Sequence, residues 1–343
     1  MPAHGEGLFP SKPMKVLLTG ANGFVGSHIL DRLRARGIAT AVLLRPASNR
    51  RFIEAHLPHV DVRAGSIADP RSLDAAMQDV THVIHCAGLT KALRLSEFHE
   101  VNQTGTRCVV EAVNQQPGRI QRLVHISSLA AGGPAPADQP AREDNPPHPV
   151  SEYGRSKLGG EQEVRGACRS EHVILRPPAV YGPRDTAFLQ LFQAIQAHVL
   201  PRFGDGRQAL SFVFVKDLAE AAVTCLTHPA AAGKTFYVAS PEVTTARGLA
   251  DEIVGQMKTW TLPLPLPMAA LWTLCYLQEA VSRLTRRPNV LSAQKYAELR
   301  APGWVCDPAR LRQELGLVCG TTLRRGIAET LEWYRQQGWL RGG

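Results

Sequence analysis

The sequence predicts an α/β protein: a doubly wound parallel sheet followed by a smaller, mostly helical C-terminal region. Short, nearly all-apolar segments alternate with helix-like segments through the first half of the chain, as they do when crossover helices connect parallel strands. Because these segments do not alternate polar with apolar residues, both faces of the sheet are expected to be covered. A glycine-rich turn after the first segment marks the place where such sheets bind dinucleotides.

The expected strands are short and rich in Val, Ile and Leu: Val16–Leu18, Ala41–Leu44, Val60–Arg63, His82–His85, Leu123–Ile126 and His172–Leu175. Helices are expected at Ser27–Arg36, Ser72–Met77, Glu97–Gln115, Tyr153–Cys168, Ala187–His198, Leu218–His228 and Arg247–Gln256, with two more between Gly303 and Gly338. This order indicates a Rossmann-type dinucleotide-binding domain over residues 14–180, to which later segments return, and a substrate-binding region over 181–343. Residues 1–13 are rich in Gly and Pro without an apolar core, which indicates a disordered tail and not a signal peptide.

Composition argues against several classes of protein. The chain has 39 basic and 30 acidic residues, a formal charge of +9. The basic residues are scattered and no nucleic-acid-binding module accompanies them, so we expect a solvated basic surface and no nucleic-acid partner. Seven cysteines without a C-x-x-C pair indicate buried thiols of a reducing compartment, not a disulfide framework or a zinc site. We therefore expect a cytoplasmic protein without a metal.

The glycine-rich turn joins the first strand to the first helix. Glycines in this spacing let the backbone turn tightly and approach a pyrophosphate, whose charge then lies at the positive end of the helix. By itself the pattern is weak, because its spacing is G-x-x-G-x-x-G rather than G-x-G-x-x-G. The residues assigned to a cofactor in this turn are Gly20, Asn22, Gly23, Phe24, Val25 and Gly26.

A Y-x-x-x-K pattern supplies the candidate catalytic groups. Tyr153 and Lys157 are four residues apart on a predicted helix, so both side chains face the same way. A free tyrosine has a pKa near ~10, too high for a base at neutral pH, and a neighbouring ammonium is expected to lower it. Lys157 can also donate to the ribose of a dinucleotide. Ser127 ends an apolar strand, where its hydroxyl can hydrogen-bond the substrate oxygen that changes charge in hydride transfer. With the glycine turn, these residues predict a nicotinamide-dependent enzyme.

Seven ordered motifs run along the chain: Thr19–Gly26, Gly65–Asp69, His85–Gly88, Val101–Thr106, Ser127–Ser128, Tyr153–Lys157 and Arg176–Pro183. In this order they resemble the extended short-chain dehydrogenases/reductases, in the group of NAD(P)-dependent epimerases, dehydratases and 3β-hydroxysteroid-dehydrogenase-like enzymes. The resemblance extends from about Met14 to about Leu340, which is nearly the whole chain.

The resemblance implies roles for further residues. Asp69 is expected at the adenine edge of the cofactor, with Ile67 near the ring. Ala87 and Gly88 resemble the strand-end pair that passes close to the cofactor. Asn102 resembles the family's helix asparagine, which helps to hold the active-site geometry; the alternative is a helix-surface amide.

The same resemblance bears on the catalytic serine and on the nicotinamide. Pro177 to Val180 resemble the loop beside the nicotinamide. Of the two neighbouring serines, Ser127 fits the catalytic position better because it lies five residues before Gly132, as in the family's strand-end pattern. Ser128 stays the alternative.

The charge after the second strand favours NADP over NAD. NAD sites of this architecture usually end that strand with an acidic residue for the ribose hydroxyls. Here the strand is followed by Arg45, with Arg50 and Arg51 shortly after, and a guanidinium can pair with a 2′-phosphate. We therefore assign Arg45 to the cofactor. Alternatively, Arg45 stacks on the adenine, which would suit NAD equally.

Two substrate classes stay open. The apolar run at 261–277 would be costly to expose, and the chain end resembles the 3β-hydroxysteroid-dehydrogenase-like branch. Both favour hydride transfer at an apolar, sterol- or terpenoid-like alcohol or ketone, and a keto product with an adjacent 4-carboxylate can also lose carbon dioxide. Arg184, Arg202 and Arg207 can instead bind a pyrophosphate, as in a nucleotide-sugar epimerase or dehydratase.

Segment 261–277 is interrupted by three prolines and is shorter than the ~20 residues of a spanning helix. It is expected either to pack within the small region or to roof an apolar pocket or touch a membrane peripherally. A non-enzymatic cofactor-binding or membrane-associated scaffold is the remaining alternative, which the intact Tyr153 and Lys157 disfavour. A homodimer through the helices that carry Asn102 and Tyr153 is usual in the family.

Overall fold

A computed structural model describes residues 13–203, 206–266, 273 and 293–341. Of the tail expected over 1–13, only residue 13 is among the described residues. Of segment 261–277, the described residues are 261–266 and 273.

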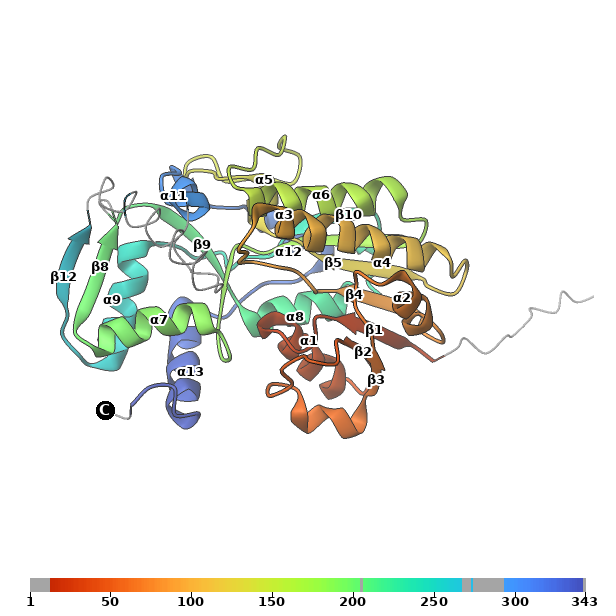
Figure 1. Cartoon of the computed structure of the whole chain (residues 1–343). Coiled ribbons are helices and arrows are strands. Elements are labelled where there is room, and N and C mark those ends of the chain that lie inside the picture. The colour runs from red at the N-terminus through yellow and green to blue at the C-terminus, as the bar shows by residue number, and fades with distance from the viewer. Residues whose placement is uncertain (1–12, 204–205, 267–272, 274–292, 342–343) are drawn as a thin grey trace, which may run out of the picture.

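The centre of the molecule is a seven-stranded parallel sheet with the strand order β10-β6-β5-β4-β1-β2-β3 (Figure 1). Its strands are β1 (Lys15–Thr19), β2 (Ala39–Leu44), β3 (Asp61–Ala64), β4 (His82–His85), β5 (Arg122–Ile126), β6 (Glu171–Arg176) and β10 (Lys234–Tyr237). The order reverses between β1 and β4, so a ligand crevice is expected outside the carboxyl ends of these two strands. The predicted Rossmann-type parallel sheet is confirmed.

Helices cover both faces of this sheet (Figure 1). On one face, apolar residues of α1 (Phe24–Ala35), α8 (Val215–Thr224) and α12 (Ala309–Leu315) pack in one core with β1, β2 and β4 to β6. On the other face, α2 (Pro70–Ala76), α4 (Gly105–Asn114) and α6 (Glu152–Ala167) enclose a second core. Full coverage explains why the strands lack polar alternation. Both α8 and β10 come from the second half of the chain and return to the large domain.

Two helix predictions need correction. The helix expected over 97–115 is divided into α3 (Leu95–His99), a π-helical turn η2 (Glu100–Thr104) and α4, and such a turn often marks a functional position inside a helix. The helix expected to reach His228 ends at Thr224. Pro229 begins a short 3₁₀ turn, η3 (Pro229–Ala231), and a proline disfavours helical backbone in the residue before it.

The smaller lobe contains strands that the sequence did not predict. Its sheet joins β7 (Ala179–Tyr181), β9 (Ala209–Phe214), β11 (Val243–Thr245) and β13 (Gly303–Trp304), and β8 (Val199–Phe203) pairs with β12 (Leu262–Leu266). The helices are α7 (Thr186–Gln196), α9 (Ala246–Met257), α11 (Ala293–Leu299) and α13 (Leu323–Gln336). An aromatic core of Tyr181, Phe192, Phe212, Phe214 and Tyr334 holds them together. Strands of two or three residues, such as β13 and β7, are too short to show a period of two.

The remaining elements are short. A 3₁₀ turn, η1 (Glu54–His59), lies between β2 and β3, and α5 (Leu129–Gly132) follows β5. Within the described ranges no helix is both long and apolar enough to cross a membrane. The six cysteines in those ranges are free thiols, and Cys275 lies outside them.

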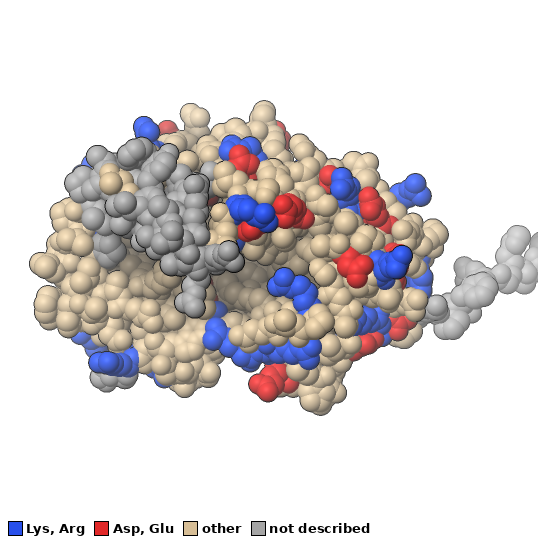
Figure 2. Space-filling view, in the orientation of Figure 1, with Lys and Arg blue, Asp and Glu red and all other residues tan. Residues whose placement is uncertain are grey.

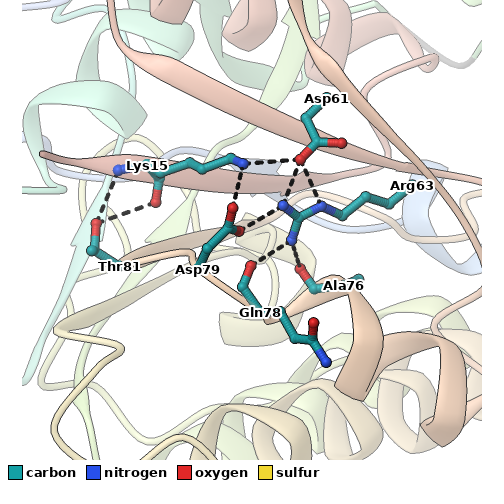
Figure 3. Close-up of polar contacts among 7 residues, drawn as sticks. All are labelled: Lys15, Asp61, Arg63, Ala76, Gln78, Asp79 and Thr81. Atoms are coloured by element: carbon teal, nitrogen blue, oxygen red, sulfur yellow. Dashed lines mark hydrogen bonds and ion pairs between the residues drawn. The ribbon is translucent and has the colours of Figure 1, made fainter. Parts of the chain in front are cut away.

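A cluster of four charged residues fastens the edge strand β3 to the centre of the sheet (Figure 3). Lys15 Nζ of β1 lies 2.9 Å from Asp61 and 2.7 Å from Asp79. Arg63 of β3 contacts the same two carboxylates at 2.5 and 2.6 Å. Arg63 also donates to the carbonyl oxygens of Ala76 and Gln78 at 2.6 and 2.7 Å. Hydrogen bonds from Arg63 and Lys15 lower the pKa of Asp61.

We expect Arg63→Met to destabilise the protein by about 1–2 kcal/mol, because the largely covered guanidinium satisfies two carbonyls as well as two carboxylates. Exposed ion pairs alone would contribute less. Urea denaturation should show the loss, and Arg71→Met, which removes an exposed arginine of α2, is the control. Equal stability of the two variants would contradict this role for the cluster.

Candidate active site

The glycine turn lies between β1 and α1, against the end of β4. Gly20 has φ +74°, and a Cβ there would lie 2.6 Å from the backbone nitrogen of Ala87. A Cβ on Gly26 would lie 2.0 Å from the carbonyl oxygen of Gly20. The turn is therefore too tight for side chains at these positions. It presents the first amides of α1, which begins at Phe24 and Val25, and these amides fit the pyrophosphate of a dinucleotide.

Thr19, which begins the glycine motif but was assigned no role of its own from the sequence, ties the turn to the end of the neighbouring strand β4. Its hydroxyl lies 2.8 Å from Nδ1 of His85 and accepts a hydrogen bond of 3.2 Å from the amide of Ala87. Burial lowers the pKa of His85 to about 3, so its imidazole is neutral at physiological pH. Thr19 thereby sets the distance between the ends of β1 and β4.

Asn102 lies in the π-helical turn and is 1% exposed, so it is not a helix-surface amide. Its side chain binds both backbone groups of Leu89, at 2.8 and 2.9 Å, and donates to Ser156 Oγ at 3.0 Å. A Cβ on Gly88 would meet Asn102 Oδ1 at 3.1 Å and Lys157 Nζ at 3.8 Å. Asn102 thus connects the segment after β4 to helix α6, next to Lys157.

Tyr153 stands on the first turn of α6, half-buried, with its ring 6.0 Å from that of Phe98. Burial raises the pKa of Tyr153 to about 12, against the lowering effect of a hydrogen bond with the Ser128 side chain. The expectation that a nearby ammonium dominates this pKa is therefore wrong for the structure as it stands. Burial in a low-dielectric site disfavours the phenolate more strongly.

Ser127, which the sequence analysis favoured as the catalytic serine, points away from Tyr153. Its hydroxyl donates to Glu161 Oε1 at 2.6 Å and is buried. Ser128 has extended backbone, with φ −161° and ψ 152°, and adjacent residues of an extended chain point to opposite sides. The structure therefore brings Ser128, and not Ser127, to Tyr153.

Lys157 is buried and donates to the carbonyl oxygen of Ile126 at 2.7 Å. Burial lowers its pKa to about 8, because a charged group loses hydration in the interior. The ammonium lies beside the strand end that carries both serines, one helical turn from Tyr153. From this position it can reach a ribose that lies next to Gly88.

The remaining cofactor candidates lie in the glycine turn and in the connection between β3 and α2. Asn22 donates to the Asn49 carbonyl at 3.2 Å and so joins the glycine turn to the loop after β2. Asp69 caps α2 by accepting a bond of 3.2 Å from the amide of Arg71. Ile67 packs against the second core.

The arginines after β2 differ in their surroundings. Arg45 and Arg50 are exposed. Arg51 lies over the rings of Phe52 and Trp339, 4.4 and 4.8 Å from their centres. Arg51 is exposed as well. Of the three, Arg45 is the one that directly follows the last residue of β2, Leu44.

The segment from Pro177 to Val180 connects the two sheets. It leaves β6 at Arg176 and enters β7, which pairs with β9 of the smaller lobe. The Pro177 carbonyl accepts a bond of 2.8 Å from the amide of Leu129, next to Ser128. The serine strand and the smaller lobe thus meet at one place.

Comparison with known proteins agrees with this geometry. A sequence model of the NAD dependent epimerase/dehydratase family matches residues 16–239. Ceramide reductase of Caulobacter vibrioides is 33% identical over 330 residues, covering 95% of this chain and 96% of that protein. Sterol demethylase protein B of Methylococcus capsulatus is 26% identical over 343 residues, which cover 95% of this chain and 100% of that protein.

Among solved structures, the UDP-glucose 4-epimerase of Thermus thermophilus in complex with NAD aligns with a TM-score of 0.75 at 25% identity, covering 94% of this chain and 99% of the other. The glycine turn, the β4 end and the Tyr153–Lys157 helix suit a dinucleotide of the kind bound there. The chain therefore belongs to the NAD dependent epimerase/dehydratase family, and it is an NAD(P)-dependent enzyme of the extended short-chain dehydrogenase/reductase type.

Proposed function

We propose that the enzyme transfers hydride between NADP(H) and a secondary alcohol or ketone of an apolar lipid of sterol, terpenoid or ceramide type. The observation that carries the chemistry is that the Ser128 side chain lies close enough to the Tyr153 hydroxyl to lower its pKa, beside the buried ammonium of Lys157. The likeness to ceramide reductase and to a sterol demethylase protein supports the substrate class.

In this proposal the reductive direction follows from the state of Tyr153. Burial raises its pKa to about 12, so its hydroxyl holds a proton at neutral pH. Reduced nicotinamide, when held by the glycine turn and Lys157, would supply the hydride for the carbonyl carbon. Tyr153 gives its proton to the carbonyl oxygen, Ser128 hydrogen-bonds that oxygen, and solvent restores the tyrosine proton. Lys157, charged below its pKa of about 8, favours the transient phenolate. In the oxidative direction the same groups take the proton back.

The contacts of the candidate pyrophosphate arginines support an apolar substrate. Arg184 is engaged by Asp31 of α1 at 2.8 Å. Arg202 is exposed on β8, which pairs with β12 at the far end of the smaller lobe (Figure 1). Arg184 therefore has a carboxylate partner without a diphosphate. A nucleotide-sugar epimerase remains the second candidate, favoured by the likeness to the Thermus enzyme. Dimerisation through the Asn102 and Tyr153 helices also stays a proposal.

The purified enzyme should retain a bound small molecule of its substrate class. Mass spectrometry of aqueous and organic extracts of the protein can identify that molecule. We expect NADP(H) together with a sterol-, terpenoid- or ceramide-like lipid. Loss of carbon dioxide on incubation with NADP would identify a 4-carboxylated substrate. A retained nucleotide sugar would replace the proposal with the epimerase and direct attention to Arg202 and Arg207.

Two neighbouring serines offer a matched test of the active site. We expect Ser128→Ala to lower turnover by ~10²-fold or more, as when a hydrogen bond to a developing oxyanion is removed, and Tyr153→Phe to lower it similarly. Ser127→Ala should stay within a few-fold of wild type in turnover, because its hydroxyl faces Glu161, and Arg176 still holds both oxygens of that carboxylate. Transfer of deuterium from [4-²H]NADPH to the extracted lipid measures each rate. A larger loss in Ser127→Ala than in Ser128→Ala would reverse the assignment.

Cofactor preference should depend on Arg45. We expect Arg45→Gln to weaken NADPH binding by about tenfold or more while NADH binding changes little, because a charge-assisted bond to the 2′-phosphate is lost. Isothermal titration measures both affinities. Arg51→Gln is the control variant. The Arg51 guanidinium lies on aromatic rings, so its loss should lower the stability of the protein more than it changes the preference for NADPH over NADH. Equal NADPH and NADH affinities of the wild type would refute the charge argument.

A further inference from the structure

The end of the smaller lobe carries four exposed apolar side chains, which we call the β12 patch. Trp260 is 65% exposed, Leu262 66%, Leu264 48% and Val199 40%. Leu262 and Leu264 are two residues apart on β12 and so share one face of the strand, and Val199 pairs with Leu262 across the ladder. Grouped exposed apolar residues of this size mark an interaction surface more often than scattered ones do.

The patch is held in place and is not a loose end. The amide of Leu262 donates to the His198 carbonyl at 2.8 Å. The Trp260 ring stacks on the His198 ring with a centroid distance of 4.3 Å and an interplanar angle of 9°. Behind these residues, Phe192 and Ile195 of α7 and Ile253 of α9 belong to the buried core of the lobe.

Another β-strand is a poor partner for this face. The amide of Leu262 points toward β8, where it meets the His198 carbonyl. Successive backbone amides of a strand alternate in direction, so the nitrogens of Pro263 and Pro265 face the edge of the ladder away from β8. A proline has no N–H to donate, and prolines on an edge strand block the addition of a further strand. The occupant must therefore contact side chains and not the backbone.

The charge around the patch is positive. Lys258, two residues before Trp260, is exposed on the C-terminal cap of α9. Arg202 of β8 is also exposed, but it pairs with Pro265 and so lies on the other side of the ladder from Leu262 and Leu264. In Figure 2 the lower end of this lobe shows Lys or Arg but no Asp or Glu. Exposed Trp and Leu side chains flanked by basic residues are the combination that peripheral proteins present to anionic membranes.

We propose that the β12 patch docks the enzyme on an anionic lipid bilayer, from which it takes its substrate. The proposal rests on the lipid class of the proposed substrate, because a water-insoluble substrate has to be reached in a membrane. Trp260, Leu262, Leu264 and Val199 enter the interfacial layer of the bilayer, while Lys258 contacts acidic headgroups.

The test measures how much of the full-length protein sediments with two kinds of vesicle. One kind is anionic and contains phosphatidylcholine and phosphatidylglycerol; the other contains phosphatidylcholine alone. We expect binding to the anionic vesicles to fall at least tenfold in the combined variant Trp260→Ser, Leu262→Ser, Leu264→Ser. Leu95→Ser is the matched control, because Leu95 is also half-exposed, at 50%, but lies on α3. The control should bind vesicles like the wild type.

NADPH binding, the melting temperature and the oligomeric state are measured for each variant and should stay unchanged. Three results would overturn the proposal: wild-type binding by the combined variant, no vesicle binding by the wild type, or a change in oligomeric state showing that the patch holds a second copy. A lower melting temperature with unchanged vesicle binding would mean that the chain itself covers the patch. Vesicle binding can be measured without turnover. A failure of the membrane proposal is therefore distinguished from a failure of the proposed lipid substrate, which mass spectrometry tests.

Discussion

Glu161 is a fully buried carboxylate on α6, and the geometry of the active site depends on the bonds that it accepts. Arg176, at the end of β6, donates to both of its oxygens at 2.8 and 2.7 Å, and Ser127, at the end of β5, donates at 2.6 Å. Burial by itself raises the pKa of Glu161, but the hydrogen bonds and charge of Arg176, the charge of Arg165 and the bond from Ser127 together outweigh it and leave the pKa lowered. A buried pair of this kind adds little net stability, yet it penalises any arrangement that separates its members. It therefore fixes the register of α6 against two strand ends.

That register determines which groups meet. Because α6 is held at Glu161, Lys157 one turn earlier reaches the Ile126 carbonyl, and Tyr153 reaches Ser128. Arg176 also donates to the Tyr237 hydroxyl at 3.2 Å, which adds β10 to the same network. The site thus joins three neighbouring strands of the large sheet with one helix. The small lobe is attached at the point where the chain leaves β6, next to the strand end that carries Ser128.

Burial has opposite effects on the two ionisable groups of the site. It raises the pKa of Tyr153 and lowers that of Lys157, because in both cases the neutral form is favoured. A protonated tyrosine suits delivery of a proton to a carbonyl oxygen. The nearby cation of Lys157 then limits the cost of the phenolate that delivery leaves behind. An apolar substrate would preserve this low-dielectric environment, whereas a diphosphate would bring further charge into it.

The sequence by itself determined the parallel sheet, the glycine turn and the helix that carries Tyr153 and Lys157. These follow from local patterns: runs of Val, Ile and Leu for strands covered on both faces, and fixed spacings for the turn and the helix. It did not determine the small lobe's strands, because two- and three-residue strands such as β13 and β7 have no detectable period. Nor could it choose between Ser127 and Ser128. The two are adjacent, and in extended chain they face opposite sides, so only the tertiary structure, through the bond from Ser127 to Glu161, decided which one meets Tyr153.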